Sequence, residues 1–254
     1  IVAWMVREGV DWKLLYVLAG GMCTLLILLA WKAGYPVHKK QSSEQDSINF
    51  MSSIKLLKNP YAMGFSLGAF LYVAAESAIY VWMPSYLVCD ASSLSAMYAV
   101  SVFFSLRAAG RFVGIWMMQR YNWSLVLMLF SFAIMLCFIV GLIGGKTLAL
   151  YTFPLTGIFM SVIYPTFNSK GISCFGKHEH GTVAGVILFF TAAGAAAGPF
   201  IMGVISDAYG GDAKYGFIVA TVFTAILFAG LLYNYLFNPT DKRLAEVEAA
   251  EYGH

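Results

Sequence analysis

Long apolar stretches separated by short polar joins dominate the chain. Seven of them reach the length of about 20 residues that a helix needs to cross the roughly 30 Å hydrocarbon core of a bilayer. They do not alternate between apolar and polar positions as barrel strands do, and continuous helices pair every backbone group inside lipid. We therefore expect an all-α integral membrane protein with seven transmembrane helices. The expected spans are residues 14–31, 61–83, 94–115, 123–142, 148–169, 182–205 and 215–237.

The composition supports this class and narrows the function. Of the 254 residues, 60% are hydrophobic and 11% are charged, whereas soluble domains carry roughly 25% charged residues. The four cysteines have no CxxC spacing and are interpreted as small apolar filler. The basic residues lie beside the expected spans rather than in a patch typical of nucleic-acid binding. We expect a protein that is not an enzyme and has no catalytic residues, metal site, cofactor or nucleic-acid partner.

Lysine and arginine are unevenly divided between the two ends of the spans. Of the 16 in the chain, twelve fall on one set of alternate joins and four on the other. Because these residues accumulate on the cytoplasmic side, the richer set is expected inside. This predicts a multi-pass protein of the inner (plasma) membrane with a cytoplasmic C-terminus. The richer set comprises Lys32, Lys39, Lys40, Lys55, Lys58, Arg107, Arg111, Arg120, Lys170, Lys177, Lys242 and Arg243.

Two polar segments lie outside the spans. The join 32–59 contains SINFMSSIKLLKNP, whose apolar residues recur every three positions beside Lys55 and Lys58, as in an amphipathic helix on the inner leaflet. The tail, 238–254, is charged, has helical propensity and is expected to be loosely ordered. The chain begins at Ile1 rather than Met, and we interpret it as a fragment of a longer protein.

Two segments of the chain resemble each other. AAGRFVGIWMMQRY (108–121) and AAGPFIMGVISDAY (196–209) share Ala-Ala-Gly, Phe and Tyr, and a second Gly recurs with a one-residue slip. The first segment ends the third expected span, and the second ends the sixth, which runs in the opposite direction. Inverted repeats of three helices build many secondary transporters, so the last six spans are expected to form two such repeats.

The second span carries one carboxylate, Glu76, within FLYVAAESAIYVWMPSYLV (70–88). A charge at that depth costs about 2.5–3.5 kcal/mol, and such residues usually face the bundle interior or a wet cavity. On an α-helix, Tyr72, Glu76 and Tyr80 share one face. A carboxylate between aromatic rings suits a sugar, whose hydroxyls donate to the acid while its C–H face stacks on the rings. Proton coupling is a rival use of Glu76, and a structural tie to a neighbouring helix is a third.

Further polar residues are candidates for a cavity wall or a gate. In SVIYPTFNSKG, Pro165 removes a backbone hydrogen bond and can open a kink that frees a carbonyl. Tyr164 and Asn168 beside it are expected either to contact substrate or to pair between helices. Arg107 and Arg111, expected near the inner end of the third span, either latch an inner gate or snorkel to the interface.

These motifs resemble the C-terminal half of a major facilitator superfamily transporter. The segment DWKLLYVLAGGMCTLLILLA resembles the sixth helix of that family, and LLKNPYAMGF resembles the central loop leading into helix seven. The segment AGRFVGIWMMQRY resembles the Gly-Arg motif between helices eight and nine, and AGPFIMGVISDAYG resembles the end of helix eleven. The segment FLYVAAESAIYVWMPSYL is similar to helix seven of the fucose-permease type, in which a tyrosine, a glutamate and a tryptophan recur.

The resemblance covers essentially the whole chain and implies an architecture. It assigns residues 1–31 to the sixth helix of an N-terminal half, 32–59 to the cytoplasmic central loop, 60–237 to a C-terminal six-helix bundle and 238–254 to the tail. It implies a substrate bound between two six-helix halves and alternating access, driven in most bacterial sugar members by protons. Helices one to five, which carry the proton-coupling carboxylates in the fucose-permease type, are absent, so the missing N-terminal half is an expected partner.

We therefore expect a fragment of a secondary active transporter for proton-coupled uptake of a sugar. The substrate-binding candidates are Glu76, Tyr72, Tyr80, Tyr164 and Asn168, and the gating candidates are Arg107 and Arg111. A carrier or exporter of an organic acid, a nucleoside or a drug is the alternative on the same fold. A complete seven-helix receptor or pump is more remote, because the last span lacks the mid-depth lysine that retinal attachment needs.

Overall fold

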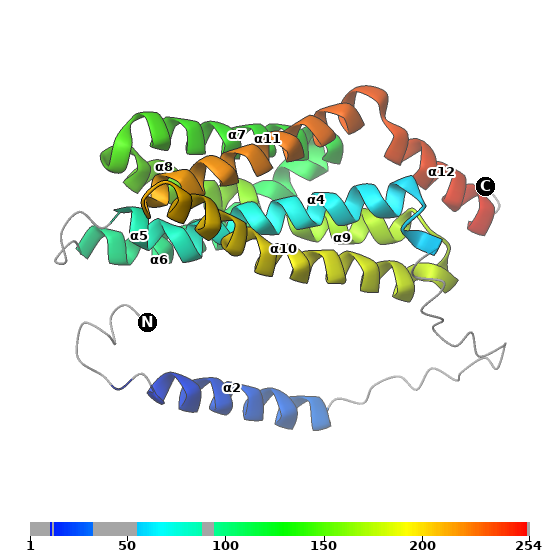
Figure 1. The fold of residues 1–254 in the computed structure, drawn as a ribbon. Coiled ribbons are helices and arrows are strands. Elements are labelled where there is room, and N and C mark those ends of the chain that lie inside the picture. Colours follow the sequence, from blue (N-terminus) through cyan, green and yellow to red (C-terminus); the bar gives the residue numbers. More distant parts are fainter. Residues whose placement is uncertain (1–10, 12, 33–54, 88–93, 253–254) are drawn as a thin grey trace. The chain divides into compact units, whose positions relative to one another are not determined.

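The computed structural model describes residues 11, 13–32, 55–87 and 94–252, and Figure 1 draws the other residues as a thin grey trace. The chain divides into two units, residues 1–47 and 48–254. In the first unit, α2 (Lys13–Lys32) is a single helix of 20 residues. The amphipathic helix expected in the join 32–59 lies almost wholly outside the described residues.

The second unit is built from helices in the part that the structure describes. They are α4 (Pro60–Ser77), the π-helix η1 (Ala78–Trp82), α5 (Met83–Leu87), α6 (Leu94–Arg120), α7 (Trp123–Ile143), α8 (Gly145–Met160), α9 (Ile163–Ser173), the 3₁₀ turn η2 (Lys177–Glu179), α10 (His180–Ala208), α11 (Ala213–Phe237) and α12 (Pro239–Tyr252). Three of these, α4, η1 and α5, follow one another in a single span, as do α8 and α9. Together with α2, the described residues contain seven spans long and apolar enough to cross a membrane, which confirms the expected number.

Side-chain caps fix where several spans begin. The side-chain oxygens of Asn59, Asn122 and Asp212 each accept a hydrogen bond from the backbone N–H two residues further on, at 2.9, 2.8 and 2.9 Å. Such caps satisfy backbone donors that have no partner within a first helical turn. Pro60 occupies the first position of α4, where a missing N–H leaves no hydrogen bond unmade. These local signals explain why the observed starts agree with the hydropathy pattern.

The two recurring Ala-Ala-Gly segments pack in equivalent ways. Helix α6 lies along α8, and α10 lies along α4. A Cβ added at Gly110 would lie 2.6 Å from the Ile158 carbonyl oxygen, and one added at Gly198 would lie 2.7 Å from the Ala74 Cα. Each glycine thus lets the second helix of one repeat approach the first helix of the other repeat. The symmetry of these two contacts agrees with two inverted three-helix repeats.

The first helix of each repeat is interrupted, and a proline accounts for each interruption. In the first repeat, the π-helix ends just before Pro84, and the Met83 N–H bonds to the Ala78 carbonyl. In the second repeat, α8 and α9 are separated at Ser161 and Val162, one turn before Pro165. A proline has no N–H for the carbonyl four residues earlier and its ring crowds that carbonyl, so a helix can depart from regular geometry there. At Pro165, where the sequence allows a kink, the structure has a break between α8 and α9.

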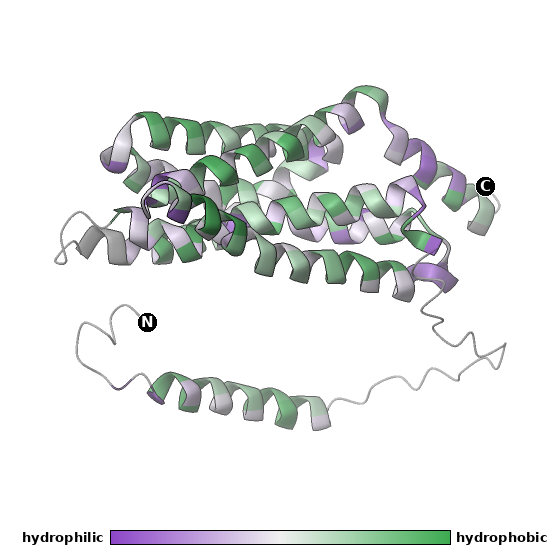
Figure 2. Cartoon of the chain, viewed as in Figure 1, coloured by the Kyte–Doolittle hydropathy of each residue, from purple (hydrophilic) through white to green (hydrophobic). Residues whose placement is uncertain are grey.

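Much of the surface of the second unit is apolar, as a bilayer requires. Figure 2 shows hydrophobic residues along the helices and hydrophilic residues at turns and on α12. Phe112 on α6 and Phe200 on α10 are 79% and 70% exposed. Inside the bundle, the rings of Phe153 and Phe217 stack with centroids 4.2 Å apart. A soluble domain would bury such residues, so these faces are suited to lipid or to other membrane helices.

The charged tail differs from expectation because it is an ordered helix. The Trp123 indole N–H donates to the Asp241 carboxylate at 2.7 Å, which ties α12 to the start of α7. The Arg243 Nε donates to the carbonyl of Cys174 at 3.2 Å, which ties α12 to the end of α9. The tail has the helical propensity that the sequence indicates, but the prediction of loose order was wrong because these side-chain partners lie more than 60 residues away in sequence.

Candidate functional site

Glu76 is buried in α4 and forms an ion pair with Arg107 of α6. Its relative exposure is 6%, while the side chain of Arg107 remains 21% exposed. The sequence pattern placed Arg107 near the inner end of its span, because that span was expected to stop at residue 115. Helix α6 continues to Arg120, so Arg107 is its middle residue. At this position the guanidinium of Arg107 lies at the depth of the buried acid.

Tyr72 links this pair to the broken helix. Its ring is 1% exposed, and its hydroxyl donates to the carbonyl of Met160 at 2.8 Å. Met160 is the last residue of α8, and carbonyls at a helix end lack partners within that helix. The Arg107 Nη2 donates to the same hydroxyl at 3.5 Å. The break near Pro165 thus supplies the acceptor that orients the phenol of Tyr72.

Tyr164 completes an aromatic wall beside the pair. Its ring stacks on Tyr72 with centroids 6.4 Å apart and an interplanar angle of 17°. Tyr164 is the second residue of α9, directly after the break, and it is only partly buried. Two aromatic rings from different helices therefore lie next to one carboxylate and one guanidinium.

Tyr80 and Arg111 lie at the edge of this cluster. Both are close enough to Tyr72 to interact electrostatically with its hydroxyl. Tyr80 lies in η1 and is 38% exposed, in contrast to the buried Tyr72. The extra residue of the π-turn rotates the helix beyond Ala78, so Tyr72 and Tyr80 do not share the environment that a regular α-helix would give them.

Asn168 is the one candidate that the described contacts do not bring into the cluster. It is half-buried on α9, one turn beyond Tyr164 and therefore on the same face of that helix. No hydrogen bond joins its side chain to another described residue of the cluster. The structure thus assembles Glu76, Arg107, Tyr72 and Tyr164, with Tyr80 and Arg111 alongside.

Trp82 lies in η1 near the outer end of its span, where the sequence favours a membrane-interface anchor over a ligand. Its indole N–H is buried and has no hydrogen-bond partner among the described residues. Its six-membered ring lies against Gly203 and Gly216, where added Cβ atoms would be 3.4 and 3.6 Å away. Pro84 follows two residues later, at the end of the π-turn that carries Trp82.

The chemistry of the cluster is recognition rather than bond cleavage. A carboxylate accepts hydrogen bonds, a guanidinium donates several, and tyrosine rings offer flat apolar faces. The Arg107 Nε is buried and has no partner among the described residues, so the pair has spare hydrogen-bonding capacity. The described part of the chain holds no group of three His, Cys, Asp or Glu residues that could bind a metal ion. An uncharged polyhydroxylated solute matches these donors, acceptors and rings.

Comparisons with known proteins identify a matching family and several similar proteins. A family model described as the Major Facilitator Superfamily matches residues 1–199. The L-fucose-proton symporter of Escherichia coli (strain K12) is 26% identical over 217 residues, covering 83% of this chain and 49% of that protein. The glucose/galactose transporter of Brucella abortus biovar 1 (strain 9-941) is 29% identical over 150 residues, covering 57% of this chain and 36% of that protein.

A solved structure has the same fold. The crystal structure of FucP, a Major Facilitator Superfamily transporter in the outward conformation, superimposes with a TM-score of 0.71 at 22% identity. The match covers 86% of this chain and 53% of that one. The chain therefore spans about half the length of the relatives it matches. The all-α membrane fold expected from the sequence is confirmed.

Proposed function

The chain belongs to the Major Facilitator Superfamily, and we propose that it is the second half of a secondary active transporter that takes up a sugar together with a proton. Two relatives are by name a fucose-proton symporter and a glucose/galactose transporter. The proposed first half of the transporter completes the substrate site across the seam, and the two halves rock about it in alternating access. The same fold also serves other solutes, such as organic acids and nucleosides, and the uptake experiment below distinguishes them from sugars.

One observation carries the proposal: a mid-membrane carboxylate paired with a partly exposed guanidinium. Charged residues at this depth are rare, and they usually pair with another group and mark a substrate or ion pathway. In this proposal, Glu76 and Arg107 form hydrogen bonds with the sugar hydroxyls. The rings of Tyr72, Tyr80 and Tyr164 stack on the sugar's C–H face. Arg107 exchanges its bond to Glu76 for one to the sugar, which couples occupancy of the site to the contact between α4 and α6.

Arg111 and Asn168 have supporting roles in this proposal. Arg111 lies one turn beyond Arg107, toward the end of α6, where it can latch a carboxylate or a helix C-terminus when the site closes. Asn168 lies one turn beyond Tyr164 on α9 and supplies an amide to the same cavity wall. Both are partly or fully exposed in this half, as residues that meet a second half should be.

We also propose that the protein lies in the inner (plasma) membrane with its C-terminus in the cytoplasm. The support is the uneven distribution of lysine and arginine. Arg107 and Arg111 are removed from that count because both lie within a span, and the remaining bias of ten to four is still strong. A reporter enzyme active only outside the cytoplasm, fused after His254, should be inactive; an active fusion would reverse the assigned orientation.

Uptake by the complete transporter tests the substrate. Cells that produce it should accumulate labelled hexoses, and an uncoupler should abolish the accumulation. Glu76→Gln should lower the initial rate at least tenfold, whereas Glu248→Gln, an exposed acid on α12, should leave it unchanged. If no sugar accumulates while an organic acid or a nucleoside does, the sugar assignment is wrong. If Glu76→Gln transports as the unaltered protein does, the assigned site is wrong.

A further inference from the structure

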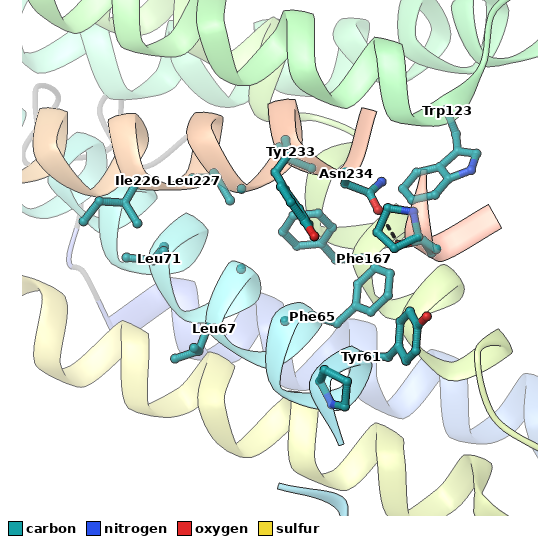
Figure 3. A pocket seen from close by; sticks show the side chains of 17 residues that line it. Tyr61, Phe65, Leu67, Leu71, Trp123, Phe167, Ile226, Leu227, Tyr233 and Asn234 are labelled. Atoms are coloured by element: carbon teal, nitrogen blue, oxygen red, sulfur yellow. Dashed lines mark hydrogen bonds between the residues drawn. The ribbon is translucent and has the colours of Figure 1, made fainter. Parts of the chain in front are cut away.

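A groove opens between α4 and α11 at the end of the bundle where α4 begins. Helices α10 and α11 are joined by a short turn and diverge away from it, so α4 is visible between them in Figure 1. The groove encloses a volume of about 480 Å³, within the range of about 300–1,000 Å³ typical of ligand sites. In Figure 3 the side chains of Leu67 and Leu71 on α4 face those of Ile226 and Leu227 on α11 across it.

Two glycines keep the groove open. Gly64 on α4 and Gly230 on α11 line opposite walls, and a Cβ added at either would meet nothing within 4 Å. The floor is formed by Phe167, whose ring packs edge-on against Phe65 with centroids 5.9 Å apart. The space is therefore bounded by rigid apolar walls and is not occupied by described side chains.

The groove faces outward along its length. Leu67 is 45% exposed and Ile226 is 52% exposed, and both line the groove. Because α4 and α11 are long and apolar enough to cross a membrane, the opening is expected to face lipid rather than water. An apolar chain from that medium can enter the groove without desolvating any polar group.

The end of the groove nearest the membrane surface is aromatic and cationic. Tyr61 and Trp123 line this end (Figure 3). The Arg243 guanidinium lies 6.0 Å from the ring centre of Tyr61, and the Lys170 ammonium lies 5.6 Å from that of Trp123. Tyrosine and tryptophan are favoured at the height of lipid headgroups.

Two acids in this region, Asp241 and Glu246, already have partners. The Asp241 carboxylate accepts hydrogen bonds from Trp123 at 2.7 Å and from Asn122 at 3.3 Å. Glu246 forms an exposed ion pair with Arg243 at 3.2 Å. Lys58, two residues before α4, and Lys242 add exposed positive charge beside the rim. Lysines and arginines therefore outnumber the acids at this end of the groove, which is suited to a phosphate.

We propose that this groove binds a phospholipid of the leaflet in which α4 begins. An acyl chain lies between α4 and α11 over Phe167, and the anionic headgroup lies among Lys58, Lys170 and Arg243. The apolar walls, the lipid-facing opening and the cationic aromatic rim match the three parts of such a lipid. The bound chain also bridges α4, which carries Glu76, to α11 on the outside of the bundle.

Filling the groove tests the acyl-chain part. Gly64→Leu and Gly230→Leu each place a side chain in open space, and leucine is the better helix former, so both variants should fold. The matched control is Gly185→Leu on α10, where an added Cβ also meets nothing within 4 Å outside the groove. Binding of a phosphatidylglycerol with a fluorescent acyl chain should fall at least tenfold in both groove variants and remain unchanged in the control. Equal binding in all four proteins would overturn the proposal.

Removing charge tests the headgroup part. In the unaltered chain, phosphatidylglycerol should bind at least fivefold more tightly than phosphatidylcholine of the same chains. The double substitution Lys170→Gln with Arg243→Gln should abolish this preference, whereas Lys214→Gln, an exposed lysine at the opposite ends of the spans, should not. A preference that persists in the double variant would overturn the assigned headgroup contacts.

Photo-crosslinking identifies the occupant without relying on affinity. A benzophenone attached at Ile226→Cys in the full chain, in membranes rich in phosphatidylglycerol, should form an adduct with phospholipid. An adduct with another segment of protein in place of lipid would show that a helix covers the groove and would overturn the proposal. The result is independent of sugar uptake, so failure here leaves the transport proposal standing.

Discussion

The proposed function depends most on the Glu76 carboxylate, and its ion-pair partner explains why a charge can be buried there. Removing an ionised acid from water is costly, and an adjacent guanidinium offsets that cost only when both groups stay together. Arg107 supplies the guanidinium from a different helix, and the Tyr72 hydroxyl bridges from Arg107 to the broken end of α8. Three helices thus meet at one buried charge.

Breaking this pair from one side should destabilise the fold. Glu76→Gln or Arg107→Gln leaves an unpaired charge in a buried position and is expected to lower the free energy of unfolding by about 3 kcal/mol. The double substitution removes both charges and should recover most of that loss. Denaturant titration in detergent measures all three. The control, Glu246→Gln, breaks only the exposed pair with Arg243 and should change stability by less than about 0.5 kcal/mol.

Additive losses in the double variant would contradict this prediction. They would mean that Glu76 and Arg107 each stabilise the fold through other neighbours. The double variant should also fail to transport sugar although it is folded, because it keeps the packing of the site and loses its charges.

The sequence located most of this cluster but not its geometry. Glu76 and Tyr72 were identifiable because polar groups are rare in apolar spans. The depth of Arg107 was misjudged because hydropathy falls near Arg111 and the span was ended too early. Asn168 was favoured by its polarity alone, and nothing in the pattern tells whether such a residue faces the cluster. Side-chain contacts between helices depend on packing that no single span specifies.

The two interrupted helices and the two glycine contacts make the repeats visible in the structure. Gly110 and Gly198 occupy equivalent places, each on the second helix of a repeat and each against the first helix of the other. The shared Ala-Ala-Gly motif is therefore conserved between repeats for close packing. Hydropathy predicted the spans well because their length is set by the bilayer, whereas the π-turn and the break depend on single prolines.

Adding one methyl group to either glycine should have a similar effect. Gly110→Ala and Gly198→Ala each bring a Cβ under 3 Å from backbone atoms of the facing helix, and such overpacking costs about 1–3 kcal/mol. Gly185→Ala has open space and should be neutral or slightly stabilising. Thermal unfolding in detergent distinguishes the three variants. A large loss at only one of the two repeat positions would contradict their equivalence.

The docking of α12 should control the reactivity of Cys174. This thiol lies between α9 and η2, outside the spans, and burial raises its pKa to about 11 despite nearby Arg243 and Lys170. Only the thiolate reacts, so a pKa raised from 9.0 to about 11 lowers its fraction at pH 8 about a hundredfold. Labelling by a maleimide should be slow and should rise about tenfold per pH unit from pH 8 to 10.

Undocking the helix should reverse this protection. With the other cysteines replaced by Ser, Asp241→Ala removes the acceptor of the Trp123 indole and should speed labelling of Cys174 at pH 8 at least tenfold. Lys214→Gln, at the opposite ends of the spans, is the control and should not. If Asp241→Ala left the labelling rate unchanged, α12 would not be what shields the thiol.

At the scale of the whole molecule, the chain fits the proposal that it is one half of a two-part transporter. Its described six-span unit carries a polar cluster in mid-membrane and broad apolar faces, and it spans about half the length of its relatives. The partial exposure of Tyr80 and Arg107 beside a buried charge supports the proposal that a second half covers this face. Membership of the superfamily was predictable from the motifs, whereas the substrate was not, because it depends on side chains from both halves.

Accessibility of position 80 in the complete transporter tests whether the cluster faces a water-filled seam. Tyr80 and Phe132 are both 38% exposed in this half, but Phe132 lies on α7, away from the cluster, and is expected to face lipid. Tyr80→Cys should react with a membrane-impermeant maleimide, a transported hexose should slow that reaction at least fivefold, and Phe132→Cys should not react. This proposal would be contradicted if neither cysteine reacted, or if no sugar changed the labelling rate at position 80. Either result would show that the buried acid does not face the substrate pathway.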